Sequence, residues 1–242
     1  MNTARSLFFM TFLALLTGAM GVFLLPALLF GPDVARAIIK IWSRLALGAL
    51  ALICGVRHRI EGSENLPAGA AIVAANHQSM WETIALFAVL KRPTMVFKRE
   101  LLKVPVYGLW ARASGVMLDR EAGAKAIRAL RAATAERLRR GDQIVIFPEG
   151  TRGPPGGLLP LLPGIAGVYL AAEVPVTPAI HDSGFFWRHP GLTKTPGTIT
   201  LKILPPIPAG LPRREFMTRL EAALSSARLA GAAVPAREPE AA

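Results

Sequence analysis

The chain has 242 residues, which is long enough for one sizeable α/β domain with an appendage. Hydrophobic residues make up 52% of it and charged residues only 18%, yet the formal net charge is +12. Soluble nucleic-acid binders are basic but rarely this apolar, so the composition disfavours binding to nucleic acid. It favours binding of the positively charged protein to a membrane surface with anionic lipids. The single cysteine, Cys54, excludes an intrachain disulfide and is expected to be a small buried hydrophobe.

The first element is an uncharged apolar run from Ser6 to Pro32. It exceeds the roughly 20 residues that a membrane-spanning helix needs. It is also longer than the apolar core of a cleaved signal peptide, which is about 7–15 residues. Gly18, Gly21 and Pro26 are positions where the helix could kink. We therefore expect this run either to span the bilayer or to fold back within one leaflet.

The second element, Val34 to Val56, carries a cation on every helical turn at its start. Arg36, Lys40 and Arg44 are spaced by four residues and so form one stripe on a helix. The uncharged remainder is too short to span a bilayer. The pattern predicts an interfacial helix whose stripe lies among anionic head groups, with Trp42 at the boundary. An ordinary amphipathic helix with a solvated charged face is the alternative.

From Arg57 onward, short β-like runs alternate with helical ones, which predicts an α/β domain with a largely parallel sheet. The β-like runs are Val56–Ile60, Ala70–Ala75, Thr94–Phe97, Val116–Asp119, Gln143–Phe147, Val174–Ile180 and Gly197–Leu204. The clearest helices are Glu121–Arg140, Ile165–Ala172 and Arg214–Leu229. The last residues are rich in Ala, Pro and Glu and are predicted to be disordered. The expected division is residues 1–56 as membrane-anchoring helices, 57–229 as the folded domain and 230–242 as the tail.

One histidine stands between a β-like run, Ala70–Ala75, and a helix-like run, Thr83 to Leu90. Glu82 follows His77 by five residues, whereas neighbours on one helix are three or four apart. We therefore expect His77 in the loop, with Glu82 reaching back from the first helical turn to hold one ring nitrogen as N–H. The other nitrogen would then be free to accept a proton as a general base. The structural alternative is a capping box from Ser79 to Glu82, in which the carboxylate only satisfies a backbone donor.

Two further sequence runs could contribute to a binding site: one directly follows a predicted strand, and the other is itself a predicted strand. The run from Phe97 to Gly108 places Lys98 and Arg99 directly after a strand, where cations could hold an anionic substrate group. A solvated charge run is the alternative. The run from Val174 to Ala179 has no titratable group, and we interpret it as an apolar strand that lines a pocket.

The run from Ile146 to Arg152 follows a very apolar strand. A proline and a glycine in it set a sharp turn, which presents Glu149, Thr151 and Arg152 at the edge of the sheet. The next loop, Gly153 to Gly164, is rich in Gly, Pro and Leu and apolar for a surface connection. We expect a lipid-facing lid, with a packed loop as the alternative.

These four blocks together resemble the glycerolipid acyltransferase family, and most closely its bacterial lysophosphatidic acid acyltransferases. The hallmarks are H-x4-D/E, a K-x-E-L block that ends in Pro and Gly, F-P-E-G-T-R, and a late V-P-V-x-P strand. They occur here in that order between His77 and Pro178. One block would support the resemblance only weakly, but four blocks in this order behind an apolar N-terminus are specific for the family.

The resemblance implies that an acyl group moves from a thioester to the sn-2 hydroxyl of 1-acyl-glycerol-3-phosphate, giving phosphatidic acid. His77 would deprotonate that hydroxyl, and Glu82 would orient and stabilise the imidazole. Direct attack by the hydroxyl needs no acyl-enzyme, in agreement with a chain that has no G-x-S-x-G elbow. Lys98 and Arg152 would grip the phosphate. The residues expected to bind substrate are Lys98, Glu149, Gly150, Thr151 and Arg152.

The resemblance also implies a sheet of about seven strands flanked by helices, with a groove for the acyl chain over the strand ends. Backbone N–H groups would stabilise the oxyanion. Acyl-CoA or acyl carrier protein would be the co-substrate, without metal or other cofactor. The expected location is the inner (plasma) membrane, with the catalytic domain facing the cytoplasm. His58, His181 and His189 are expected to be structural or exposed.

Two departures from the family pattern stand out. Glu82 occupies a position where most relatives carry Asp, and the added methylene changes its approach to His77. The Gly153–Gly164 loop lacks polar residues that many relatives have, including a cation near Leu162. Two alternatives therefore stay open: an acyltransferase for another lyso-lipid, such as a lyso-ornithine lipid, and a non-catalytic basic membrane scaffold.

Overall fold

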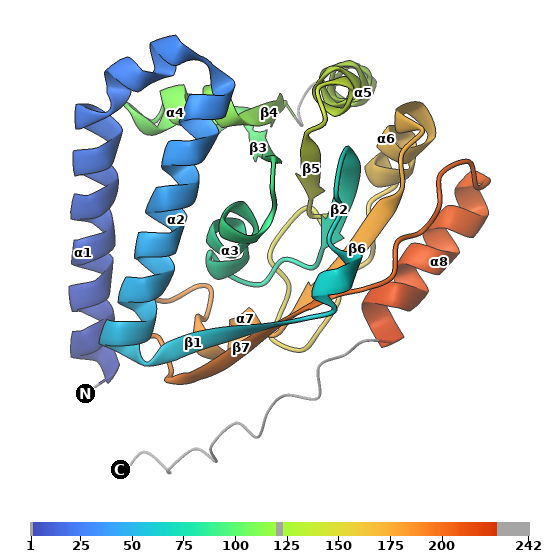
Figure 1. Ribbon diagram of the computed structural model, residues 1–242. Helices are drawn as coiled ribbons and strands as arrows, with labels where there is room; N and C mark the ends of the chain where they lie inside the picture. Colours follow the sequence, from blue (N-terminus) through green and yellow to red (C-terminus); the bar gives the residue numbers. More distant parts are fainter. Residues whose placement is uncertain (1, 120–122, 227–242) are drawn as a thin grey trace.

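A seven-stranded sheet forms the centre of the computed structural model, which describes residues 2–119 and 123–226 (Figure 1). The strands are β1 (Val56–Glu61), β2 (Ala71–Ala75), β3 (Pro93–Lys98), β4 (Gly115–Leu118), β5 (Gln143–Ile146), β6 (Val176–His181) and β7 (Gly197–Ile203). Their order in the sheet is β1-β7-β6-β2-β5-β3-β4. Every neighbouring pair is parallel except β6 and β7. The predicted mainly parallel sheet is therefore confirmed.

Helices cover both faces of this sheet. They are α1 (Asn2–Phe23), α2 (Pro32–Cys54), α3 (Trp81–Val89), α4 (Tyr107–Ser114), α5 (Gly123–Arg139), α6 (Gly164–Ala172), α7 (Ser183–Phe186) and α8 (Arg213–Ser226). Short 3₁₀ turns are η1 (Leu25–Phe30), η2 (Ser63–Asn65) and η3 (Arg99–Lys103). The predicted helical stretch at 121–122 and everything after residue 226, including the predicted tail, lie outside the described residues.

Strand β2 shows why two cores form. All five of its residues are buried, as expected for a parallel strand covered on both sides. Successive side chains point to opposite faces, so Val73 and Ala75 enter the core beneath α1, α2 and α3. Ile72 and Ala74 enter the second core, beneath α5, α6 and α8. The sheet is thus the middle layer of three.

Helices α1 and α2 run side by side at the left of Figure 1 and pack against the domain. The start of α1 is fixed by the segment before β7: the ring of Phe9 meets Trp187 edge-on at 5.6 Å, and Lys194 N donates to Ser6 Oγ at 2.8 Å. Both helices are long and apolar enough to cross a membrane, by length and composition alone. The expected boundary between anchor and domain at residue 56 stays a prediction.

The expected position of the α2 cations among lipid head groups is wrong for two of the three. Arg36 is buried, and its Nη2 donates to the buried carboxylate of Asp142 at 2.9 Å. Lys40 Nζ donates to Leu90 O at the end of α3, at 2.6 Å. The reason is that a buried carboxylate and an unpaired helix-end carbonyl both need donors, and α2 supplies them from this face.

The indole of Trp42 also points inward rather than to a membrane boundary, because its Nε1 donates to Thr17 Oγ1 of α1 at 3.1 Å. The outward faces of the two helices are apolar instead. The exposed large side chains of the two helices and of the connection between them are Leu7, Phe8, Leu15, Val22, Phe23, Leu24, Leu29, Phe30, Val34, Ile41, Leu45 and Leu52. So many exposed apolar side chains are typical of a membrane or protein interaction site.

Candidate active site

The carboxyl ends of β6, β2, β5, β3 and β4 lie along one edge of the sheet because these strands are mutually parallel. Loop 76–80 follows β2, loop 147–163 follows β5, and residues 182 onward follow β6. Ligands of open parallel sheets bind outside the carboxyl ends of the strands. The candidate side chains gather at this edge.

His77 and Glu82 are in direct contact, as the five-residue spacing predicted. His77 Nδ1 lies 2.7 Å from Glu82 Oε1, with the carboxylate fully buried and the imidazole side chain 16% exposed. The imidazole also stacks on Phe147, with ring centroids 4.3 Å apart and an interplanar angle of 18°. Since Nδ1 faces an acceptor, it carries the proton. Within the described chain, no hydrogen bond occupies Nε2.

Glu82 is held by backbone and hydroxyl donors as well. Oε1 also accepts from Gln78 N at 2.8 Å and Ser79 N at 2.7 Å, and Oε2 accepts from Ser79 Oγ at 2.6 Å and Ser183 Oγ at 2.9 Å. Burial by itself would raise the pKa of Glu82. The nearby imidazoles of His181 and His77 and the hydrogen bond from Ser79 outweigh burial and lower the pKa to about 2. The carboxylate is therefore ionised at any physiological pH.

Glu82 caps the start of α3 and also contacts His77, so the capping alternative and the predicted contact with the imidazole are both present. Ser79 N donates to Glu82 Oε1, and Ser79 Oγ accepts from Trp81 N at 2.9 Å, so donors at the start of α3 are satisfied. The same carboxylate that caps α3 thus fixes the imidazole. The longer Glu side chain can serve both purposes because it reaches back over the first turn.

His181 lies beneath the dyad, where we expected a structural or exposed histidine. It is fully buried at the end of β6, and its Nε2 donates to Asn76 O at 2.8 Å. Asn76 continues the pairing of β2 with β6 through its side chain: Nδ2 donates to His181 O and Oδ1 accepts from His181 N, both at 2.9 Å. Burial lowers the pKa of His181. His181 therefore supports the floor of the site through its hydrogen bond to Asn76 O.

Glu149 joins the loops after β2 and β5. Its Oε1 accepts from His77 N at 2.7 Å, and its Oε2 accepts from Leu159 N at 2.8 Å. Burial raises the pKa of Glu149. Gly150 adopts a left-handed φ of 72° in the turn, and a Cβ on Gly153 would lie 2.9 Å from Glu149 Oε2. Glu149 therefore shapes the site by holding the backbone.

The Gly153–Gly164 segment matches the packed-loop alternative more closely than the lid. Gly153 N donates to His77 O at 2.7 Å, so the segment begins on the loop that carries His77. Leu158 and Leu161 pack on the core beneath α5 and α6, while Leu162 is exposed.

Arg152 lies beside the dyad. Its Nε donates to Ser79 O at 3.0 Å, and its Nη1 lies 3.2 Å from Nδ1 and 3.4 Å from Nε2 of His189. The two similar distances mean that Nη1 faces the ring rather than one nitrogen. The desolvation of His189 and the positive charge of Arg152 lower the pKa of His189. The guanidinium is thus held at one end and faces an exposed imidazole at the other.

Lys98 and Thr151 have fewer contacts with the other candidate site residues. Lys98 is exposed at the end of β3, which is separated from β2 by β5. Strands are spaced by about 4.8 Å, so Lys98 stands roughly 10 Å along the same edge from His77. No interaction within the described ranges joins Lys98 to His77, Glu82 or Arg152. The Thr151 side chain is exposed.

Ser183 escaped sequence reasoning, whereas His181 and His189 were expected to be structural or exposed, and they are buried and exposed respectively. Ser183 and His181 follow the V-P-V-T-P strand directly, so the pairing of β6 with β2 is the signal that could have found them. His189 has no local signal, because it lies beyond α7 and is not part of any of the four blocks. Among residues 2–119 and 123–226, no three His, Cys, Asp or Glu side chains gather as a metal site would require.

Known proteins share this sequence pattern. A family model described as "Acyltransferase" matches residues 57–182. A 1-acyl-sn-glycerol-3-phosphate acyltransferase of Pseudomonas aeruginosa is 34% identical over 194 residues, which cover 79% of this chain and 75% of that protein. The human 1-acyl-sn-glycerol-3-phosphate acyltransferase alpha is 30% identical over 68% of this chain, which spans only 60% of that protein's length.

The fold is shared as well. The crystal structure of the 1-acyl-sn-glycerophosphate acyltransferase PlsC from Thermotoga maritima matches with a TM-score of 0.76 at 27% identity. The match covers 93% of this chain and 95% of that one, so it includes the two N-terminal helices as well as the sheet.

Proposed function

Because the chain belongs to the acyltransferase family, we propose that it transfers an acyl group from a thioester to the sn-2 hydroxyl of 1-acyl-glycerol-3-phosphate, giving phosphatidic acid. One observation carries the proposal. A half-buried imidazole is hydrogen-bonded at 2.7 Å to a fully buried, ionised carboxylate, and a guanidinium lies beside it. No side chain or backbone group of residues 2–119 and 123–226 occupies the other nitrogen of the imidazole. That is the arrangement a general base needs next to an anionic acceptor.

In the proposed mechanism His77 Nε2 removes the proton from the acceptor hydroxyl as its oxygen attacks the thioester carbonyl. The imidazolium that forms keeps its Nδ1–H on Glu82, whose negative charge stabilises it. The tetrahedral intermediate then expels the thiolate, which takes the proton back from Nε2. One ester bond forms, one thioester bond breaks, and the products are phosphatidic acid and a free thiol.

Arg152 is proposed to hold the acceptor's phosphate. Its Nε is already fixed to Ser79 O, so the remaining guanidinium donors are oriented without the cost of ordering a free side chain. Lys98, at the same edge, would add a second positive charge. Glu149 and Gly150 would act indirectly, because they position the backbone of His77 and the turn that presents Thr151 and Arg152.

The apolar outward faces of α1 and α2 are proposed to hold the enzyme on a membrane, as befits a lipid acceptor. We place it at the inner membrane with the site towards the cytoplasm, where acyl-CoA or acyl carrier protein would deliver the acyl group. Cosedimentation with vesicles of anionic and zwitterionic phospholipid measures this binding directly. A protein that stays in the supernatant with both would remove the membrane from the proposal.

The proposed reaction is tested by incubating the purified protein with acyl-CoA and lysophosphatidic acid. The proposal requires free thiol and phosphatidic acid in equal amounts. Thiol release without the phospholipid product would contradict it. The donor is identified by repeating the assay with acyl carrier protein.

The acceptor is identified by competition within a panel of lyso-lipids, including lysophosphatidylcholine and a lyso-ornithine lipid. If Arg152 and Lys98 hold a phosphate monoester, lysophosphatidic acid should have the highest kcat/KM. A higher value for a lyso-ornithine lipid would replace the proposed acceptor while leaving the chemistry unchanged.

A further inference from the structure

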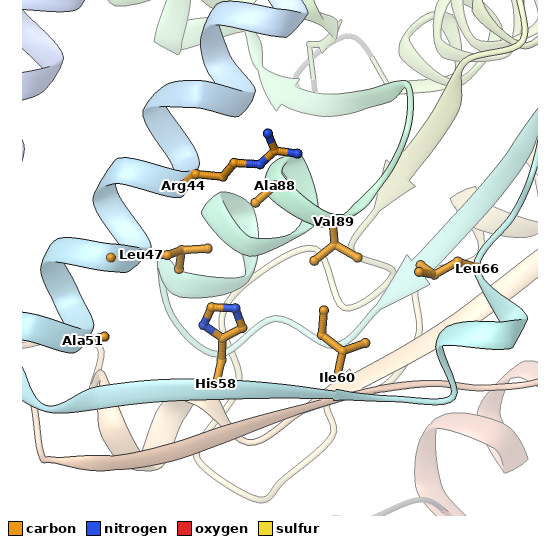
Figure 2. Close-up of a pocket in the computed structure, with 9 residues that line it drawn as sticks. Arg44, Leu47, Ala51, His58, Ile60, Leu66, Ala88 and Val89 are labelled. Carbon is orange, nitrogen blue, oxygen red and sulfur yellow. The ribbon is translucent and has the colours of Figure 1, made fainter.

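An open groove lies on the far side of α3 from the candidate active site. It has a volume of about 530 Å³ and is bounded by α2, the second half of α3 and β1 (Figure 2). Its walls are mostly apolar, with Leu47 of α2, Val89 of α3 and Ile60 of β1 among the lining side chains. Sites for small ligands have this size and apolar character, with a few polar groups that orient the ligand.

Arg44 is the charged group of this groove. Figure 2 shows its side chain extending from α2 along the rim towards Ala88. Of the three cations on α2, Arg36 and Lys40 have the partners described above. Arg44 is exposed, and no ion pair or hydrogen bond involves it within the described part of the chain. A guanidinium at the edge of an apolar groove suits an anionic head group whose tail enters the groove.

Trp81 separates the groove from the catalytic dyad. Its buried ring lies between two imidazoles: His58, which lines the groove, and His181, which supports Glu82, each with its centroid 5.9 Å away. A ligand in the groove would therefore be walled off from His77 by the start of α3. The groove is a separate site.

The groove opens towards the apolar outer face of α2. Gly48 lines it and is exposed, and Leu45 and Leu52 are exposed on the adjoining surface of the same helix. An alkyl chain could thus pass from the outer face of α2 into the groove without crossing a polar barrier.

We propose that this groove binds one alkyl chain of an anionic amphiphile, with its carboxylate or phosphate on Arg44. The occupant is a fatty acid or a lysophospholipid, which share the required chemistry. The apolar walls and the unpaired guanidinium carry the proposal together, and it does not depend on the acyl-transfer reaction.

Gly48 allows the groove to be filled without disturbing the fold. A Cβ built on Gly48 meets no heavy atom within 4 Å, and the same holds for Gly18 on the exposed side of α1. Gly48→Phe should therefore occupy the groove, whereas Gly18→Phe adds the same aromatic ring to an apolar helix away from it. The two variants form a matched pair.

Binding is measured with a dansyl-labelled undecanoate on the detergent-solubilised full chain. The wild type and Gly18→Phe should bind with equal affinity, and Gly48→Phe should bind at least about tenfold more weakly, as loss of roughly 1.4 kcal/mol of contact requires. Ala88→Phe, from the opposite wall, should match Gly48→Phe. Circular dichroism melts confirm folding of each variant.

Head-group recognition is tested with Arg44→Gln and three competitors: a fatty acid, lysophosphatidic acid and a neutral monoacylglycerol. In the wild type the anionic competitors should displace the probe about tenfold better than the neutral one, and Arg44→Gln should abolish that preference. Which anion displaces better identifies the source of the ligand. Equal binding by Gly48→Phe, Ala88→Phe and the wild type, or equal displacement by the neutral lipid, would overturn the proposal.

Discussion

The two halves of the candidate site differ in how firmly their side chains are held. On one side, Glu82 accepts hydrogen bonds from His77, Gln78, Ser79 and Ser183 and is fully buried. On the other side, Arg152 is held by Ser79 O through Nε and faces only an exposed imidazole, His189, through Nη1. Lys98 is exposed at the end of β3. The proposed base is therefore preorganised before substrate arrives, whereas the proposed phosphate-binding cations still have donors that no buried group holds.

This difference predicts how substitutions divide between rate and binding. Changes on the His77 side should lower kcat and stability, because they disturb a completed network. Changes on the Arg152 side should raise KM, because they remove a group proposed to bind the acceptor's phosphate.

The largest effect is expected for His77→Ala. Loss of a general base should lower kcat by about 10²–10⁴-fold, with little change in the KM for lysophosphatidic acid. The assay is steady-state thiol release in the presence of acceptor. His58→Ala, the same change on β1 outside the site, is the control and should keep its rate. Near-normal turnover by His77→Ala would remove it from the mechanism.

Glu82→Gln should destabilise the fold in a pH-dependent way. The pKa of Glu82 is about 2, below its ordinary value of 4.5, so the folded state favours the ionised carboxylate. The resulting stabilisation, on the order of 3 kcal/mol, is fully present above pH 4.5 and is lost as the pH falls towards 2. Urea unfolding of both proteins between pH 7 and 3 measures it. A difference that stays constant over this range would show that the carboxylate's charge is not stabilised in the fold.

Arg152→Ala should raise the KM for lysophosphatidic acid by about tenfold or more, since a charge-assisted hydrogen bond to phosphate is lost. The KM for acyl-CoA should change little. Arg99→Ala removes a cation that already pairs with Asp119 and serves as the control. An effect confined to the thioester donor would move the phosphate site elsewhere.

The smallest effect is expected for Ser183→Ala, which removes one of several donors to Glu82. Ser79 Oγ still donates to Oε2, so kcat should fall only a few-fold, in line with roughly 1 kcal/mol for one hydrogen bond. Ser114→Ala, another buried serine, is the matched control. A loss as large as that of His77→Ala would mean that Ser183 acts on the substrate directly.

Much of this arrangement could be predicted from local sequence. Short β-like runs predicted all seven strands to within two residues at each end. Strand β2 is continuously hydrophobic, as a buried parallel strand should be, whereas β1 is polar and mostly exposed. The five-residue spacing predicted that Glu82 reaches back to His77, and that contact is present. The resemblance to the acyltransferase family implied that the blocks meet over the ends of the strands.

Long-range pairing was not predictable in the same way. The cations of α2 form a stripe, which suggested an exposed face, but Arg36 pairs with Asp142, 106 residues away. Ser183 reaches Glu82 only because β6 lies beside β2. No local sequence pattern indicates which distant residues become neighbours. The outward apolar face of α2 and the side chains beneath Glu82 could therefore be identified only in the structure.

A double-mutant cycle on His77 and Glu82 tests most directly whether one imidazole and one carboxylate act as a single base. The account predicts that His77→Ala and the double variant His77→Ala with Glu82→Gln have the same kcat, because Glu82 works only through His77. Losses that multiply, with the double variant slower by the full Glu82→Gln factor, would contradict it.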